Sequence, residues 1–141
     1  LYELITLKTP VISIMAGEGG SGGALALAIA DEVWMLENAY YSVVSPEACA
    51  SILFKDSSRV AEAADHLKMF ADDLLKLEII EKVIPEPENF GEPECALEPF
   101  MNELKLSLRE KLSELMNVPG QQLVLERYGR YRRIGKYEDI V

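Results

Sequence analysis

The chain has 141 residues, 49% of them hydrophobic, which is enough sequence for one domain with a buried core. Its formal net charge of −10 argues against a nucleic-acid-binding surface. We expect no membrane association either, because no hydrophobic run approaches the roughly 18 residues of a membrane span and residues 1–8 do not resemble a signal peptide.

The first third of the chain predicts short strands and helices in alternation. Residues 1–8 resemble the end of a helix, and an apolar run predicts a buried strand over residues 11–16. A helix over residues 22–30 follows a glycine-rich stretch, and β-branched and aromatic residues predict strands at 33–36 and 41–44. This order suits a ββα repeat better than a doubly wound sheet, in which a crossover helix precedes each parallel strand.

The rest of the chain predicts mainly helices. Ser45 is placed to cap a helix, with Pro46 in its first turn and Glu47 near the positive end of the helix dipole. We therefore interpret Ser45 as a cap and Glu47 mainly as a complement to the dipole. The further elements are helices over residues 59–68, 72–77, 95–116 and 121–133, a strand over 79–84 and an acidic, proline-containing loop over 85–94.

The two C-terminal helices differ in character. The helix over 95–116 has one apolar stripe, which we expect to pack on the core or on another subunit. The members of the stripe are Leu97, Met101, Leu104, Leu108, Leu112 and Leu115. The last 21 residues contain five of the 14 basic residues: Arg127, Arg130, Arg132, Arg133 and Lys136. On an acidic chain these could meet the phosphates of a ligand, an acidic partner surface, or only solvent.

The cysteines and the histidine do not predict a metal site. Cys49 and Cys95 are far apart in the sequence and outside any C-x-x-C spacing. His66 is the only histidine and falls inside a predicted helix, where a surface or core position is a better interpretation than a ligand. We therefore expect reduced thiols and no metal in this chain.

The most informative stretch is the glycine run between the first strand and the next helix, with five glycines between positions 17 and 23. Glycine permits positive φ and lets a ligand approach the backbone, and a helix that begins there presents unpaired N–H groups. We interpret the run as a backbone site for an anion or oxyanion. The alternative is a glycine-rich turn that only packs helix on strand.

Two other chemistries match the same residues. Residues 17–22 fit the dinucleotide-binding pattern G-x-G-x-x-G, with Glu37 near the position of its ribose-binding acid, but further βαβ units would be needed. Residues 19–23 fit G-x-S-x-G, in which Ser21 would be a nucleophile. That pattern needs an acid and a histidine, and the only candidate is His66.

Two longer strings resemble one family. They are GEGGSGGAL, which starts at residue 17, and YYSVVSPEACASIL, which starts at residue 40. They are similar to the α subunits of bacterial and plastid acetyl-CoA carboxylase carboxyltransferase, in the crotonase superfamily, and the similarity continues through residues 61–87 and more loosely to ERYGRYRRIG near the end. The resemblance implies an α/β fold, a crotonase (ClpP/crotonase-like) ββα superhelix. It also implies that residues 1–92 are a partial core without its N-terminal part and that 93–141 are a C-terminal helical extension.

The same resemblance implies a function and a site. Such subunits belong to the carboxyltransferase that moves a carboxyl group from carboxybiotin to acetyl-CoA, giving malonyl-CoA in the first committed step of fatty acid biosynthesis. The implied oxyanion hole consists of backbone amides, with Gly22 and Gly23 on the carboxybiotin side. The candidate amides are those of Gly19, Gly20, Ser21, Gly22 and Gly23, and the converging pair is left open. The family's zinc module belongs to the β subunit, in keeping with a chain without metal.

The implied partners are a β subunit, in an α2β2 heterotetramer, a biotin carboxyl carrier protein and biotin carboxylase, in the bacterial cytoplasm or the plastid stroma. Hydratase-type crotonases carry a glutamate two residues after the glycine run, where this chain has Leu25, so hydratase chemistry is not expected. We expect activity only with the β subunit. A dinucleotide-binding oxidoreductase domain and an inactive partner-binding fragment remain as alternatives.

Overall fold

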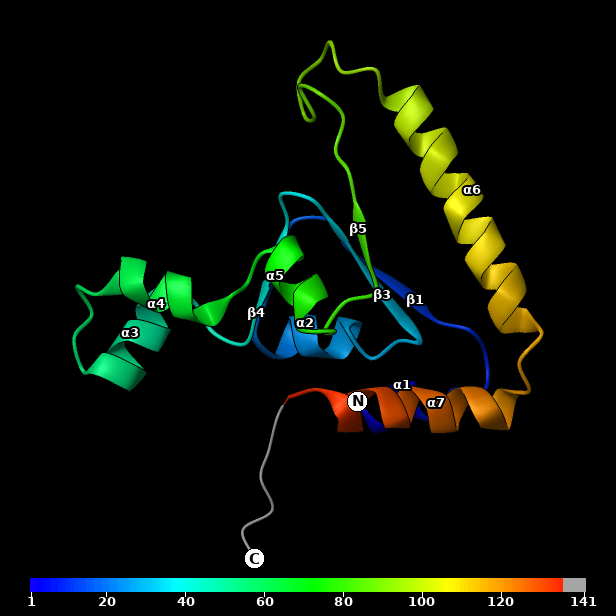
Figure 1. Cartoon of the computed structure of the whole chain (residues 1–141), viewed down its shortest axis with the longest axis horizontal. Coiled ribbons are helices and arrows are strands. Elements are labelled where there is room, and N and C mark those ends of the chain that lie inside the picture. Colours follow the sequence, from blue (N-terminus) through cyan, green and yellow to red (C-terminus); the bar gives the residue numbers. More distant parts are fainter. Residues whose placement is uncertain (136–141) are drawn as a thin grey trace, which may run out of the picture.

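A small parallel sheet forms the centre of the structure, which is a computed structural model that describes residues 1–135 (Figure 1). Its strands are β1 (Ile12–Met15), β3 (Glu32–Leu36) and β5 (Lys82–Ile84), with β3 in the middle. Trp34 of β3 pairs with Ile14 on one side and with Lys82 on the other. Because other elements cover both faces of the central strand, residues 33–36 are all buried, which explains their continuous apolar run.

A second parallel sheet contains part of the glycine run, which the sequence predicts as a loop. Its strands are β2 (Glu18–Gly20) and β4 (Tyr40–Ser42), with Gly19 opposite Tyr41. The loop prediction was wrong at β2 because Gly19 is buried and packs through its backbone. A Cβ on Gly19 would lie 3.2 Å from the carbonyl oxygen of Tyr40 and 3.3 Å from Sδ of Met15. A contact made by the backbone needs no apolar side chain, so it produces no hydrophobic periodicity in the sequence.

The order of elements confirms the predicted mixed α/β class. Strands β1 and β2 are followed by helix α2 (Ser21–Leu27), and β3 and β4 by helix α3 (Pro46–Phe54). Two strands in different sheets, followed by a helix, therefore occur twice in succession. Within residues 1–135 the parallel strands do not form the single doubly wound sheet that the dinucleotide-binding alternative requires.

A helical hairpin projects from one side of the sheets (Figure 1, left). It consists of α3 and α4 (Val60–Leu67), which pack on each other around buried Cys49, Ala50 and Ala63. The predicted cap is confirmed, since the Ser45 hydroxyl accepts a hydrogen bond of 3.2 Å from the backbone N–H of Ala48. Helix α5 (Ala71–Lys76) then leads the chain back to β5.

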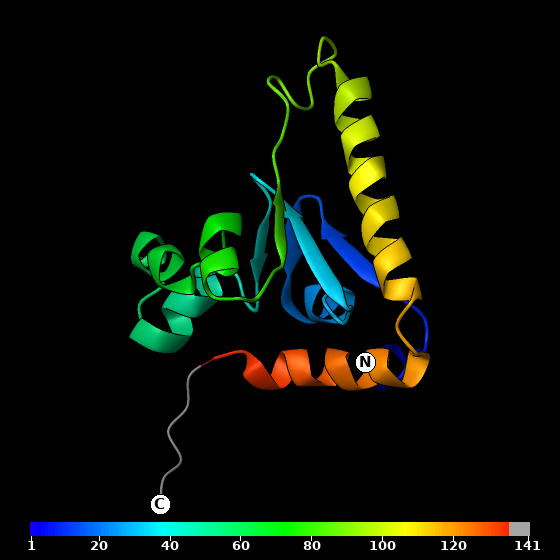
Figure 2. The same ribbon diagram turned by 45° about the vertical axis from the view of Figure 1, so that its right-hand side comes forward.

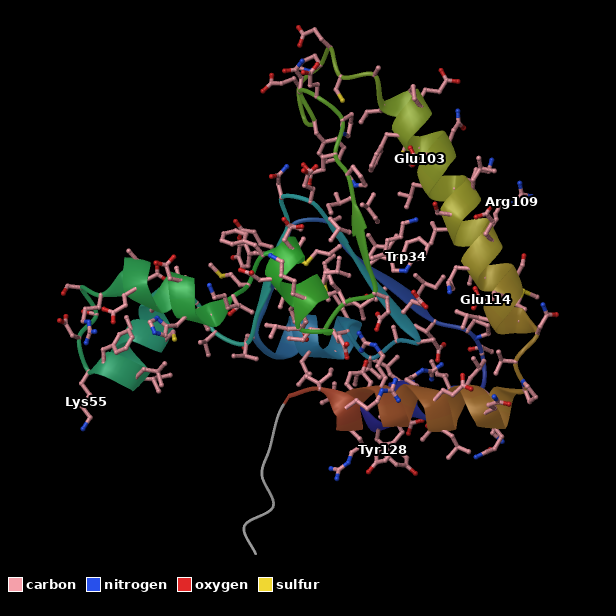
Figure 3. All side chains as sticks on the ribbon, in the orientation of Figure 1. Trp34, Lys55, Glu103, Arg109, Glu114 and Tyr128 are labelled. Atoms are coloured by element: carbon pink, nitrogen blue, oxygen red, sulfur yellow. The ribbon has the colours of Figure 1, made fainter. Side chains whose placement is uncertain are left out.

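Two longer helices lie along two sides of the sheets, as Figure 2 shows. Helix α6 (Leu97–Met116) runs along one side, and α7 (Gly120–Arg133) crosses below, next to the short N-terminal helix α1 (Tyr2–Ile5). The predicted stripe on α6 is only partly the packing face: Leu104, Leu108 and Leu115 pack or are buried, but Leu97, Met101 and Leu112 are exposed. The Trp34 side chain lies on the side of β3 that faces α6 (Figure 3). In the described part of the chain, no helix is long and apolar enough to cross a membrane.

Candidate active site at the glycine run

The glycine run spans strand β2 and the first turn of helix α2. Gly20 is the N-cap of α2, with an extended backbone at φ −129° and ψ 151°, and no side chain caps the helix. The first N–H groups of an α-helix have no acceptor within the helix. The amides of Ser21, Gly22 and Gly23 are therefore the donors that this site can offer, and all three residues are exposed.

Most of these glycines are not required by the fold. A Cβ on Gly20, Gly22 or Gly23 would meet no atom within 4 Å, and none of the three has a positive φ. Glycine at exposed helical positions costs about 1 kcal/mol relative to alanine. At Gly22 and Gly23 the chain thus carries residues that are unfavourable in a helix and that keep the space beside the backbone open. This is the geometry expected where a ligand approaches main-chain N–H groups.

Ser21 has an unusual backbone, with φ at +56°. A positive φ at a non-glycine residue is strained, and such strain often occurs at functional sites. The nucleophile interpretation nevertheless lacks its base. His66 lies on α4, where its Nδ1 is 2.7 Å from the carbonyl oxygen of Glu62 and its ring meets the edge of Phe54. The structure therefore does not bring His66 together with Ser21.

Glu18, Tyr40 and Glu47 are titratable residues in or near the two strands and the helix around this stretch, and two of them have shifted pKa values. Desolvation raises the pKa of Tyr40, and the carboxylates of Glu18 and Glu47 add to the shift. The pKa of Glu47 is held below its usual value by its own backbone N–H and by the Ser45 hydroxyl, as expected for an acid at a helix N-terminus. The backbone dipoles at the start of α2 are one source of positive potential at the glycine run.

An apolar cavity of about 270 Å³ lies along the flank of α2. Its walls include Leu25, Val43, Leu74, Ile79 and Tyr131. The glycine amides do not line this cavity, and their own surface is open. The structure therefore does not enclose the stretch from Gly19 to Gly23.

Two arginines of the basic helix α7 differ from all three sequence-based expectations. Arg127 and Arg130 are buried, and each forms an ion pair inside the chain, with Asp31 at 2.8 Å and with Glu81 at 2.5 Å. They are neither solvated nor free for a ligand. Arg132 and Arg133 are exposed, and Lys136 lies outside the described residues. The spacing of 127, 130 and 131 places these residues on one helix face but does not show that this face is buried.

Two further interpretations can be placed in the structure. The Glu37 carboxylate accepts a hydrogen bond of 3.1 Å from the backbone N–H of Glu86, so it links the ends of β3 and β5 rather than facing the glycine run. Cys49 is buried and Cys95 half-buried, both as free thiols. Within residues 1–135 no cluster of three or more His, Cys, Asp or Glu side chains could hold a metal ion.

The fold is shared with two solved structures. The first is a Pseudomonas malonate decarboxylase hetero-tetramer in complex with coenzyme A, with a TM-score of 0.65 and 18% identity over 88% of this chain and 47% of that one. The second is transcarboxylase 12S, with a TM-score of 0.55 and 16% identity over 99% of this chain and 24% of that one. At these identities the likeness defines the class of fold alone.

The sequence defines the family within that class. The sequence model described as acetyl co-enzyme A carboxylase carboxyltransferase-like matches residues 1–135, and the chain belongs to this family. The acetyl-coenzyme A carboxylase carboxyl transferase subunit alpha of Clostridium acetobutylicum is 49% identical over 97% of this chain and 49% of that protein. The subunit alpha of Ruminiclostridium cellulolyticum is 51% identical over 96% of this chain and 50% of that protein. The predicted family is confirmed, and the chain spans about half the length of these relatives.

Proposed function

We propose that this chain forms the carboxybiotin side of a carboxyltransferase site. The reaction transfers the carboxyl group from carboxybiotin, carried on a biotin carboxyl carrier protein, to acetyl-CoA and yields malonyl-CoA, the first committed step of fatty acid biosynthesis. The observation that carries the proposal is the open, uncapped backbone at Ser21, Gly22 and Gly23 in a chain of this family.

The chemistry requires donors for a developing negative charge. The bond between the carboxyl carbon and the ureido nitrogen of biotin breaks, and charge accumulates on the ureido oxygen. The methyl carbon of acetyl-CoA loses a proton, which the ureido nitrogen can accept, and bonds to the carboxyl carbon. Preorganised N–H donors at such an oxygen contribute about 3 kcal/mol each, or roughly a hundredfold or more in rate. On this chain we assign that role to two of the amides of Ser21, Gly22 and Gly23, with Gly22 and Gly23 nearest carboxybiotin. The range from Gly19 to Gly23 inferred from the sequence is narrowed because Gly19 and Gly20 belong to strand β2.

The open surface of the glycine run requires a second wall, which we assign to a β subunit in an α2β2 heterotetramer. A relative from Natranaerobius thermophilus, named subunits beta/alpha, is 49% identical over 97% of this chain and 22% of that protein, so both subunits occur there in one polypeptide. We further propose biotin carboxylase as a partner and the bacterial cytoplasm or plastid stroma as the location. The ββα units would continue as a crotonase-like superhelix, with residues 1–92 as core and 93–141 as extension.

A malonyl-CoA formation assay tests the function. Three samples receive carboxybiotin and acetyl-CoA: this chain alone, this chain with the β subunit, and a complete α subunit with the β subunit. We expect product only when the β subunit is present. Product with the complete α subunit but not with this chain would identify a partner-binding fragment. Stabilisation by NAD or NADP but not by biotin derivatives would instead support the dinucleotide-binding alternative.

A further inference from the structure

Helix α2 cannot hold its own conformation. It has seven residues, begins with two of the least favourable helix formers after Ser21, and has neither a side-chain cap nor a basic residue in its last turn. Isolated helices need about 12 to 15 residues to be even marginally stable in water. The direction of the glycine amides therefore depends on contacts between α2 and the rest of the protein.

Helix α2 packs on β2 and β4, and its C-terminal end also receives hydrogen bonds from helix α7, which lies below it in both ribbon views (Figures 1 and 2). The Tyr131 hydroxyl donates a hydrogen bond to the carbonyl oxygen of Ala28, the C-cap of α2. The same hydroxyl accepts one of 3.1 Å from the backbone N–H of Ala30. Both alanines are buried, so loss of the hydroxyl would remove a partner from two buried backbone groups.

Helix α7 is itself bonded to the segment that follows α2, at Asp31. The Arg127 guanidinium, one turn before Tyr131, donates to both carboxylate oxygens of Asp31 at 2.9 and 2.8 Å. It also donates to the carbonyl oxygens of Leu4, at 3.0 Å, and Leu7, at 2.9 Å, in the N-terminal segment. Its side chain is fully buried. The hydroxyl of Tyr131 is therefore presented to α2 from a rigid support.

We infer that Tyr131 is a positioning residue for carboxyl transfer: its hydroxyl holds the C-terminal end of α2 and thereby the amides of Gly22 and Gly23 at the other end. The inference rests on the proposed function of those amides. A seven-residue helix is only about 10 Å long, so a shift at one end moves the other. Oxyanion donors act only when they are preorganised, and a misplacement of about 1 Å can cost about a hundredfold in rate.

Tyr131→Phe in the complete α subunit, assembled with the β subunit, tests the inference. We expect kcat to fall by about ten- to a hundredfold, with KM for acetyl-CoA unchanged. Tyr128→Phe is the matched control, because it removes the same atom from an exposed tyrosine on the side of α7 that faces away from the sheet (Figure 3). Leu123→Ala is the stability control, because it weakens the packing of α7 at a buried residue that forms no hydrogen bond to α2.

A second readout follows the amides directly. The ¹H–¹⁵N resonances of Ser21, Gly22 and Gly23 should shift in Tyr131→Phe and stay in place in the Tyr128 control. Unchanged kcat in Tyr131→Phe overturns the inference, as does an equal loss of kcat in Leu123→Ala at the same loss of melting temperature.

Two other outcomes remain decisive. If the unmodified assembly makes no malonyl-CoA, the proposed function fails, and the glycine resonances alone then decide whether Tyr131 holds α2. If Tyr131→Phe does not fold, Asp31→Asn is tested instead, because it weakens the ion pair with Arg127 that holds α7 to the segment after α2. That variant must shift the glycine resonances, or the inference fails.

Discussion

Replacing Gly22 or Gly23 by alanine separates the needs of the fold from those of the reaction. Neither glycine has a positive φ, and a Cβ at either position meets no atom within 4 Å. Alanine should therefore fit without strain and gain helix propensity of about 1 kcal/mol per site. For a chain of this length, that gain corresponds to a rise in melting temperature of roughly 4 °C.

The same substitutions should reduce carboxyl transfer. The added methyl group occupies the space through which a ligand reaches the amides, and loss of a single oxyanion donor costs about a hundredfold or more in rate. Gly22→Val and Gly23→Val, with larger side chains, should abolish transfer. Stability and activity would thus change in opposite directions at one site, which is typical of residues kept for function rather than for folding.

Thermal unfolding of the chain and malonyl-CoA formation with the β subunit measure the two effects. Gly129→Ala, in the middle of α7, is the matched control, because it should stabilise the helix without affecting transfer. Ser21→Ala should keep transfer, since the donors are amides. Full activity in both alanine variants at Gly22 and Gly23 would refute the backbone site, and complete loss in a folded Ser21→Ala would favour a nucleophilic serine.

Three further predictions concern stability. Gly19→Ala should lower the free energy of unfolding by about 1 to 3 kcal/mol in urea, because the new Cβ would lie 3.2 Å from a carbonyl oxygen of β4. An unchanged urea midpoint would mean that β2 is not packed as described. Arg127→Met should cost about 3 to 5 kcal/mol by leaving the Asp31 carboxylate buried without its ion pair, and the additional change Asp31→Leu should recover part of the loss in a double-mutant cycle. The Glu47 carboxylate has a lowered pKa, through its own backbone N–H and the Ser45 hydroxyl, so its contribution should be complete above its ordinary pKa of 4.5 and be lost as the pH falls through the lowered value. Glu47→Gln should flatten this part of the pH–stability profile, and an identical profile would contradict the assignment.

Local signals in the sequence predicted most elements close to their observed limits. The Ser45 cap, the apolar run of β3 and the helix ending at Arg133 depend on neighbouring residues, so their patterns are visible without the fold. Helix α2 ends three residues earlier than predicted: the N–H of Ile29 bonds to the carbonyl oxygen of Ala26, and the N–H of Ala30 bonds to the carbonyl oxygen of Ala28 and to the Tyr131 hydroxyl. No local propensity could show the bond to Tyr131.

The sequence by itself determined the family and, apart from β2, the order of the main elements, because these follow from motifs and from periodicities along the chain. Only the tertiary structure decided that Gly19 belongs to a strand and that the arginines of α7 are buried. Tyr131 lies 101 residues beyond the Ala30 amide that it binds, and Arg127 lies 96 beyond Asp31. Whether a charge or hydroxyl faces solvent or a partner depends on which distant segment folds against it, and neither composition nor spacing contains that information.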